Sequence, residues 1–126
     1  MVFRMKRQLK DKLESLAELG ERSQAWVMAQ AADGLFGDLE RNVIRPHELE
    51  AEDPGPGKRG GEVCFTWPGH AYHRKRLADL TRTHGVAASV VQRAALHRYI
   101  AKRKHLLSGE RQLQDDLRES GPVLPP

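Results

Sequence analysis

The stretch Val63-Cys64-Phe65-Thr66-Trp67 opens the part of the chain that decides the fold, which runs on to Lys104. Aromatic side chains alternate here with smaller ones, the pattern of a strand with one buried face. Pro68 and Gly69 follow and end the strand. We therefore expect a short, half-buried strand over residues 63–67.

Two helices are predicted after this strand. The first has Leu77 and Leu80 on one face and ends at Gly85, and the second begins near Ser89. An apolar stripe at helical spacing marks the second helix and consists of Ala88, Val91, Ala95, Leu96, Tyr99 and Ile100. A strand and two helices in about forty residues cannot bury a core of their own. The N-terminal residues are therefore expected to supply the other half of one.

The N-terminal residues show the same order of elements. Residues 2–6 predict a strand with Phe3 and Met5 on one face. A helix marked by Leu9, Leu13, Leu16 and Ala17 then closes near Gly20. Ser23 is the expected N-cap of a second helix, whose apolar residues are Val27, Met28, Ala31, Ala32, Leu35, Phe36 and Leu39.

Two further segments are expected to lack packed structure. Residues 41–61 contain Pro46 and the run Pro54-Gly55-Pro56-Gly57-Lys58-Arg59-Gly60-Gly61, which predicts a flexible linker. Residues 105–126 predict a polar, partly disordered tail in which Leu106, Leu113 and Leu117 favour a short helix. The predicted organisation is a first module at 1–40, a linker at 41–61, a second module at 62–104 and the tail, with both modules in one folded unit.

An internal duplication is indicated when the chain is shifted along itself. A shift of 64 residues places helix positions on one another, among them Leu13 on Leu77, Leu16 on Leu80, Val27 on Val91 and Ala31 on Ala95. The strands align with a shift of 62, which pairs Phe3 with Phe65 and Met5 with Trp67. Such a repeat of one small unit predicts two similar halves that share a core.

Composition limits the class of protein and its partners. The 126 residues carry a net charge of +4, with 39% hydrophobic and 30% charged residues, as in a soluble globular protein. One cysteine and no long apolar run favour a cytoplasmic chain without disulfides. Residues 62–104 hold nine Lys/Arg against two acidic residues, and residues 1–12 hold five against one. Two basic regions at matching places in the halves favour a polyanion, above all nucleic acid.

Each half resembles a ribbon-helix-helix module of the Arc/MetJ/CopG superfamily. The second half shows Leu77-x-x-Leu80-Thr81, Gly85, Ser89, Val91, Ala95-Leu96 and Tyr99, and the first shows Leu13-x-x-Leu16-Ala17, Ser23, Val27 and Ala31-Ala32. The first half departs from the pattern at Glu21, where glycine is usual, and at Met28 and Leu35. The second departs from it at Gln92, where an apolar residue is usual. The tandem arrangement is similar to that of TraY-type and VirC-type accessory proteins of conjugative DNA transfer.

The resemblance implies a fold and a function. The fold would be mainly α with a two-stranded antiparallel ribbon, a monomeric tandem ribbon-helix-helix pseudo-dimer, with room for two copies to pair on DNA. The function would be sequence-specific binding of double-stranded DNA through a β-ribbon in the major groove. The chain would act as a relaxosome accessory protein of plasmid conjugation or T-DNA transfer, or as a transcriptional regulator, without catalysis and without a cofactor.

Pleating predicts which side chains would face the bases. The large apolar residues Phe3, Met5, Phe65 and Trp67 are expected to face the core. The expected base contacts are therefore Val2, Arg4, Lys6, Cys64 and Thr66. Arg4 is the strongest candidate, because its planar guanidinium matches O6 and N7 of guanine. Unequal strands predict an asymmetric DNA site.

Phosphates are expected at the start of the second helix of each half, where free backbone N–H groups and the helix dipole favour an anion. The expected phosphate contacts are Arg7, Ser23, Gln24, Arg74, Lys75, Arg76, Ala88 and Ser89. For each of the basic residues, a merely solvated surface position is the competing interpretation, and for Ser23 and Ser89 it is a purely structural N-cap.

Other chemistry receives little support from the sequence. His70, His73 and Cys64 do not follow a standard zinc spacing, so no metal site is predicted. Trp26 lies beside the apolar stripe of its helix and is expected to pack in the core, with a half-buried position or a contact with a partner as the alternatives. An alternative function is an antitoxin-like module whose C-terminal tail binds a partner protein through Leu106, Leu113 and Leu117. A helical scaffold without nucleic acid is a third interpretation, against which the uneven charge argues.

Overall fold

The computed structural model describes residues 1–58, 61–104 and 107. The elements, in chain order, are β1 (Val2–Lys6), α1 (Arg7–Leu19), α2 (Gln24–Glu40), the 3₁₀ helix η1 (Pro46–Glu48), α3 (Leu49–Glu52), β2 (Glu62–Thr66), α4 (Ala71–His84) and α5 (Ala88–Lys102). The expected fold class, mainly helical with a two-stranded antiparallel ribbon, is confirmed within this part of the chain.

The ribbon joins the N-terminal strand to a strand from the middle of the chain. β1 pairs with β2 in an antiparallel register that sets Phe3 opposite Phe65 and Arg4 opposite Cys64. Trp67 extends the pairing by one residue, because its backbone N–H donates to the carbonyl oxygen of Met1 at 3.0 Å. Phe3, Phe65 and Trp67 are buried, as the alternation predicted. The opposite face of the ribbon is left exposed to solvent.

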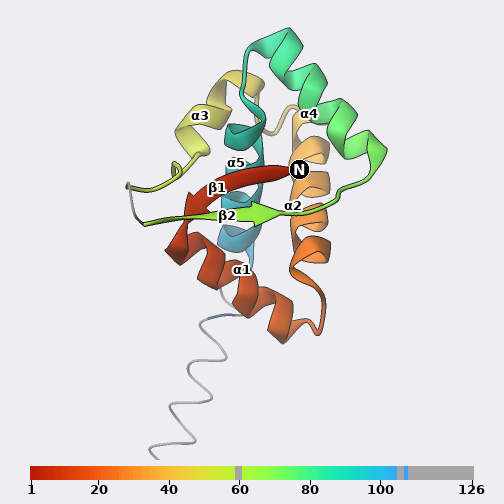
Figure 1. The fold of residues 1–126 in the computed structure, drawn as a ribbon. Helices are drawn as coiled ribbons and strands as arrows, with labels where there is room; N and C mark the ends of the chain where they lie inside the picture. The colour runs from red at the N-terminus through yellow and green to blue at the C-terminus, as the bar shows by residue number, and fades with distance from the viewer. Residues whose placement is uncertain (59–60, 105–106, 108–126) are drawn as a thin grey trace, which may run out of the picture.

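Helices cover the buried face of the ribbon. In Figure 1 the ribbon crosses in front of α2 and α5, which run in opposite directions, while α1 and α4 lie at opposite ends of this arrangement. α2 and α5 pack against each other, and α5 also contacts β1. One continuous apolar core results, with Leu13 and Met28 from the first half and Trp67 and Leu96 from the second among its fully buried side chains.

The segment between the two halves is more ordered than the sequence predicted. The expectation that residues 41–61 form a flexible linker is wrong for residues 46–52, which form η1 and α3. Ile44 and Leu49 are buried in the common core, and α3 packs on α5. Proline and glycine are frequent only in residues 54–61. The two apolar residues before that run attach the segment to the core, and the composition of the whole segment gave no sign of this.

The helix-end signals at Ser23 and Gly85 are confirmed, whereas the one at Ser89 is not. Ser23 caps α2 as predicted, since its Oγ accepts a hydrogen bond from the backbone N–H of Trp26 at 3.0 Å. α4 ends before Gly85, which takes a left-handed conformation with φ of 69°. Ser89 does not cap α5, because the helix begins at Ala88 and its N-cap is Ala87, whose side chain provides no acceptor.

Glu21→Gly is expected to raise the free energy of unfolding by about 0.5–1 kcal/mol. Glu21 has a φ of 53°, the left-handed conformation that Gly85 adopts at the end of α4. A side chain makes this conformation costly, and glycine removes that cost. Glycine also gives the unfolded chain more freedom, which offsets part of the gain. Urea unfolding of both proteins measures the difference. Glu18→Gly, inside α1, is the control and should be destabilising.

Candidate nucleic-acid interface

The exposed face of the ribbon carries the residues that the sequence singled out for base contacts. Val2, Arg4, Cys64 and Thr66 are all exposed on it. Antiparallel pairs alternate between hydrogen-bonded and non-hydrogen-bonded types. Since Met1 and Trp67 exchange backbone hydrogen bonds, Arg4 and Cys64 form a non-hydrogen-bonded pair, whose side chains stand close together. The face is therefore a narrow row of closely spaced side chains.

Two residues at one end of this face differ from expectation. Lys6 is only half-buried rather than freely exposed, because the loop residue Gly57 lies against its side chain. Glu62 pairs with Lys6 in the ladder, and its carboxylate lies 3.7 Å from the Arg4 guanidinium. Sequence reasoning did not assign Glu62, although its position two residues before Cys64 places it on the same face of the strand.

A buried ion pair holds the backbone of the ribbon at Arg4. Arg93 of α5 binds Asp53 through two hydrogen bonds, Nε to Oδ1 at 2.8 Å and Nη2 to Oδ2 at 2.9 Å. Its Nη1 donates to the main-chain oxygen of Arg4 at 3.1 Å, on the edge of β1 that faces away from β2. Both side chains of the pair are more than nine-tenths buried. Arg93 thus ties the segment after α3 to the strand.

Polar contacts also fix the ribbon from behind. The indole Nε1 of Trp67 donates to Oε1 of Gln92 at 2.7 Å in the core, which gives this buried glutamine of α5 a hydrogen-bond partner. His73 is fully buried against Trp67. Its Nδ1 accepts from the backbone N–H of His70 at 2.9 Å, so the proton resides on Nε2, which donates to Asp33 at 2.8 Å.

The start of α2 and that of α5 differ as anion sites. At α2, Ser23 is exposed, whereas Gln24 is half-buried and accepts a short hydrogen bond from Lys10, which also bonds Glu14. At α5, Ala88 and Ser89 are half-buried. A cation therefore stands beside the first turn of α2, while the first turn of α5 presents small side chains.

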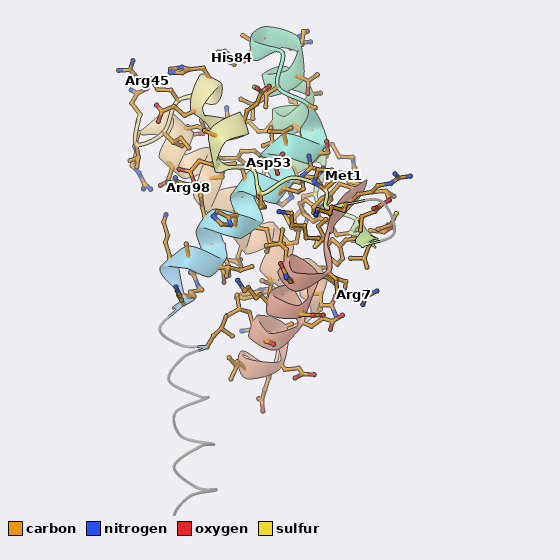
Figure 2. All side chains as sticks on the ribbon, turned by 90° about the vertical axis from the view of Figure 1, so that its left-hand side faces the viewer. Met1, Arg7, Arg45, Asp53, His84 and Arg98 are labelled. Atoms are coloured by element: carbon orange, nitrogen blue, oxygen red, sulfur yellow. The ribbon has the colours of Figure 1, made fainter. Side chains whose placement is uncertain are left out.

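The basic candidates fall into two groups. Arg74 donates to the carbonyl oxygens of Pro68 and Gly69, and Arg76 donates to Glu40 at 3.1 Å and lies over the ring of Phe36. These two cations thus have intramolecular partners. Arg7 and Lys75 are exposed and form no ion pair within the described residues. Figure 2 shows Arg7 extending on the side of the molecule that carries the ribbon.

A second polar cluster lies where α2 and α5 pack together. Asp38 is buried and accepts hydrogen bonds from Arg41 and Arg98 at 2.9 Å and from Lys102 at 3.0 Å. An open groove of about 360 Å³ lies beside it, lined by residues of both helices. Burial raises the pKa of Asp38, but the hydrogen bonds from Arg98, Lys102 and Arg41 outweigh it and lower the pKa from 3.8 to about 2.

Asp38→Asn is expected to lower stability at about pH 7 by about 1–2 kcal/mol, after allowance for the solvent around Arg41 and Lys102. Because the folded-state pKa is depressed, the carboxylate stabilises the fold above pH 3.8, and this contribution is lost as the pH falls through about 2. The difference between variant and parent should therefore shrink below pH 3.8. Urea unfolding over a pH series measures it. A constant difference at all pH values would contradict the assignment.

Cys64 and His73, which the sequence places near each other, lie in different surroundings in the structure. Cys64 is exposed on the ribbon, whereas His73 is enclosed by Trp67, Phe36 and Tyr72. In the residues that the structure describes, no group of three or more His, Cys, Asp or Glu is placed to hold a metal ion.

Burial, followed by the hydrogen bond to Asp33, raises the pKa of Tyr72.

Trp26 does not enter the core, contrary to expectation. Its side chain is exposed, and the guanidinium of Arg22 lies 4.8 Å from the centre of its ring. The position directly before Val27 puts it beside the apolar stripe of α2 rather than within it. A cation on an indole face is a favourable surface contact.

Comparisons with known proteins find no counterpart. No family model, no curated protein and no solved structure matches the chain. Among the residues that the structure describes, we also find no helix with the length and apolar content that crossing a membrane requires.

Proposed function

We propose that the chain is a tandem ribbon-helix-helix protein that binds double-stranded DNA in a sequence-specific manner, with the exposed face of the ribbon in the major groove. One observation carries the proposal. Two short strands from the two halves of the chain form an isolated antiparallel ribbon, backed by helices on one face and exposed on the other. A two-stranded ribbon has the dimensions of the major groove, which is about 12 Å wide.

The chemistry of the exposed face supports the proposal. Arg4 is free to reach outward, since its side chain is 66% exposed, and its guanidinium matches the two acceptors of guanine. Thr66 offers a hydroxyl group and a methyl group to a base edge. The short side chains of Cys64 and Thr66 leave the second strand close to any bound surface.

The charge distribution supports a phosphate backbone as the partner. Residues 62–104 carry nine Lys/Arg against two acidic residues. Arg7 and Lys75 are the cations best placed for phosphates, because they are exposed and not engaged in ion pairs within the described part of the chain. Ser23, Gln24, Ala88 and Ser89 would present backbone N–H groups at the starts of α2 and α5. Arg74 and Arg76 would have to exchange their present partners for phosphate.

Arg4→Ala is expected to weaken binding to the preferred duplex by about 1–3 kcal/mol and to relax preference at one position. The arginine offers a planar pair of donors that no neighbour on the ribbon replaces. Fluorescence anisotropy with the preferred and with random duplexes measures both effects. Arg45→Ala is the matched control, because Arg45 is exposed on the side away from the ribbon in Figure 2. Equal losses on both duplexes would make Arg4 a phosphate contact instead.

Selection of bound duplexes from a random library tests the function itself. The proposal predicts a short enriched sequence without a perfect two-fold repeat, because the two strands present different side chains. Footprinting on genomic DNA would then separate a transfer origin, expected of a conjugation accessory protein, from a promoter, expected of a transcriptional regulator. Absence of any enriched sequence would refute sequence-specific binding.

The alternative of an antitoxin-like module rests on residues outside the description. Leu106, Leu113 and Leu117 of the tail lie beyond the described residues, so the structure adds no observation in favour of a partner protein there.

A further inference from the structure

Glu62 is the acidic member of the exposed ribbon face and lies beside Arg4. Its carboxylate is 3.7 Å from the guanidinium, which is close enough to orient both groups and too far for a hydrogen bond. The Arg4 side chain is 66% exposed and that of Glu62 23%. Both groups therefore keep their hydrogen-bonding capacity, with an array of donors next to a pair of acceptors.

The surroundings of Glu62 restrict its movement. Gly57 lies near the Cα of Glu62 and against the side chain of Lys6, which is the cross-strand partner of Glu62. Asp53, four residues before Gly57, is anchored by the buried pair with Arg93, and the same arginine holds the Arg4 carbonyl oxygen. Glu62 and Arg4 thus lie together at the end of the ribbon that the Arg93–Asp53 pair holds in place.

This pattern of donors and acceptors mirrors one base pair. In the major groove, guanine presents the acceptors N7 and O6, and cytosine presents the N4 amino donor. O6 and N4 of one G·C pair are hydrogen-bonded to each other and lie about 2.9 Å apart. Guanidinium donors would meet O6 and N7, and the neighbouring carboxylate would accept from N4. An A·T pair would offer the carboxylate the O4 acceptor of thymine in place of a donor.

We propose that Glu62 is a specificity-determining residue that reads cytosine N4 of the same G·C pair whose guanine is read by Arg4. This inference rests on the proposed function and deepens it by naming the base pair. The carboxylate repels phosphates and base acceptors, so it lowers affinity for random DNA. It contributes favourable contact only where a cytosine amino group faces it.

The experiment starts from the duplex that the intact protein selects from a random library. Each cytosine is replaced in turn by pyrimidin-2-one, which lacks the N4 amino group, and binding to the intact protein and to Glu62→Gln is measured by anisotropy. For one cytosine we expect about a tenfold loss with the intact protein and less than about a twofold loss with the variant. Glu62→Gln should also bind random duplexes more tightly than the intact protein does.

Controls separate this role from a structural one. Glu50→Gln removes the same charge from an exposed position of α3 and should leave both the analogue effect and the preferred sequence unchanged. Glu62→Asp should retain part of the cytosine preference. A general loss of structure would weaken all duplexes alike, and the analogue series on the intact protein is independent of any variant.

Two outcomes overturn the inference and are distinguishable. If the intact protein selects no sequence, the proposed function fails and the inference fails with it. If it selects a sequence but no cytosine analogue distinguishes it from Glu62→Gln, DNA recognition stands and Glu62 has no part in reading.

Discussion

Arg93→Leu is expected to lower the free energy of unfolding by about 3–5 kcal/mol, a large share of the total free energy of unfolding of a small domain. The substitution leaves the Asp53 carboxylate in a site where its side chain is only 9% exposed. It also removes the donor from the Arg4 carbonyl oxygen. Urea unfolding followed by circular dichroism measures the loss.

A double variant tests whether the uncompensated charge is the cause. Asp53→Asn removes the charge and keeps the side-chain oxygen that accepts from the backbone N–H of Gly55. Arg93→Leu/Asp53→Asn should therefore recover much of the stability that Arg93→Leu loses. A single variant within about 1 kcal/mol of the parent would show that Asp53 is solvated by a rearrangement of its loop.

Trp67→Ala is expected to cost about 3–5 kcal/mol, because it opens a cavity at the junction of β2 and α4. Trp67 is 1% exposed and packs against His73, so the volume of its side chain lies within the core. The substitution also leaves the side-chain oxygen of Gln92 without its donor. Thermal unfolding of the two proteins provides the comparison.

The hydrogen bond can be separated from the volume. Trp67→Phe keeps an aromatic ring but strands the Gln92 acceptor, with an expected cost of about 1–3 kcal/mol. Adding Gln92→Leu to Trp67→Phe should restore part of that loss, whereas Gln92→Leu alone should destabilise. If Gln92→Leu alone left the stability unchanged, the hydrogen bond between Gln92 and the indole would make no net contribution to the fold.

Local patterns in the sequence were enough to predict the helices and strands and the face that each of them buries. The alternation from Val63 to Trp67 predicted a strand with the correct buried residues, and the observed strand begins one residue earlier. Gly85 and Ser23 marked helix ends correctly, because their effects act within one turn. Such signals depend on neighbours in the chain and need no knowledge of the fold.

Features that depend on distant residues escaped prediction. Arg93 and Asp53 are forty residues apart, and nothing in either neighbourhood indicates the pair. His73 was considered only as a weak metal ligand, whereas it is a core residue whose nitrogens bond His70 and Asp33. The apolar anchors within residues 41–58 are the isolated side chains Ile44 and Leu49, a signal too sparse to outweigh the prolines and glycines nearby.

The candidate site was predictable in its main part. Val2, Arg4, Cys64 and Thr66 followed from strand pleating, which fixes a face as soon as the register of the core residues is known. Engagement of Arg74 and Arg76 by neighbouring groups could not be foreseen, because it depends on where the loop after β2 and the end of α2 lie. Their roles in DNA binding, like that of the face itself, remain predictions.

The covalent link between the strands frees each of them to vary alone. A ribbon built by two identical chains must present every side chain twice, so one substitution changes both ends at once. Here Arg4 lies on one strand only, and the residue opposite it on the other strand is Cys64. A mutation can thus alter one end of the ribbon while the other is conserved by selection. The association of the strands is also immune to dilution, since neither strand has to find its partner in solution.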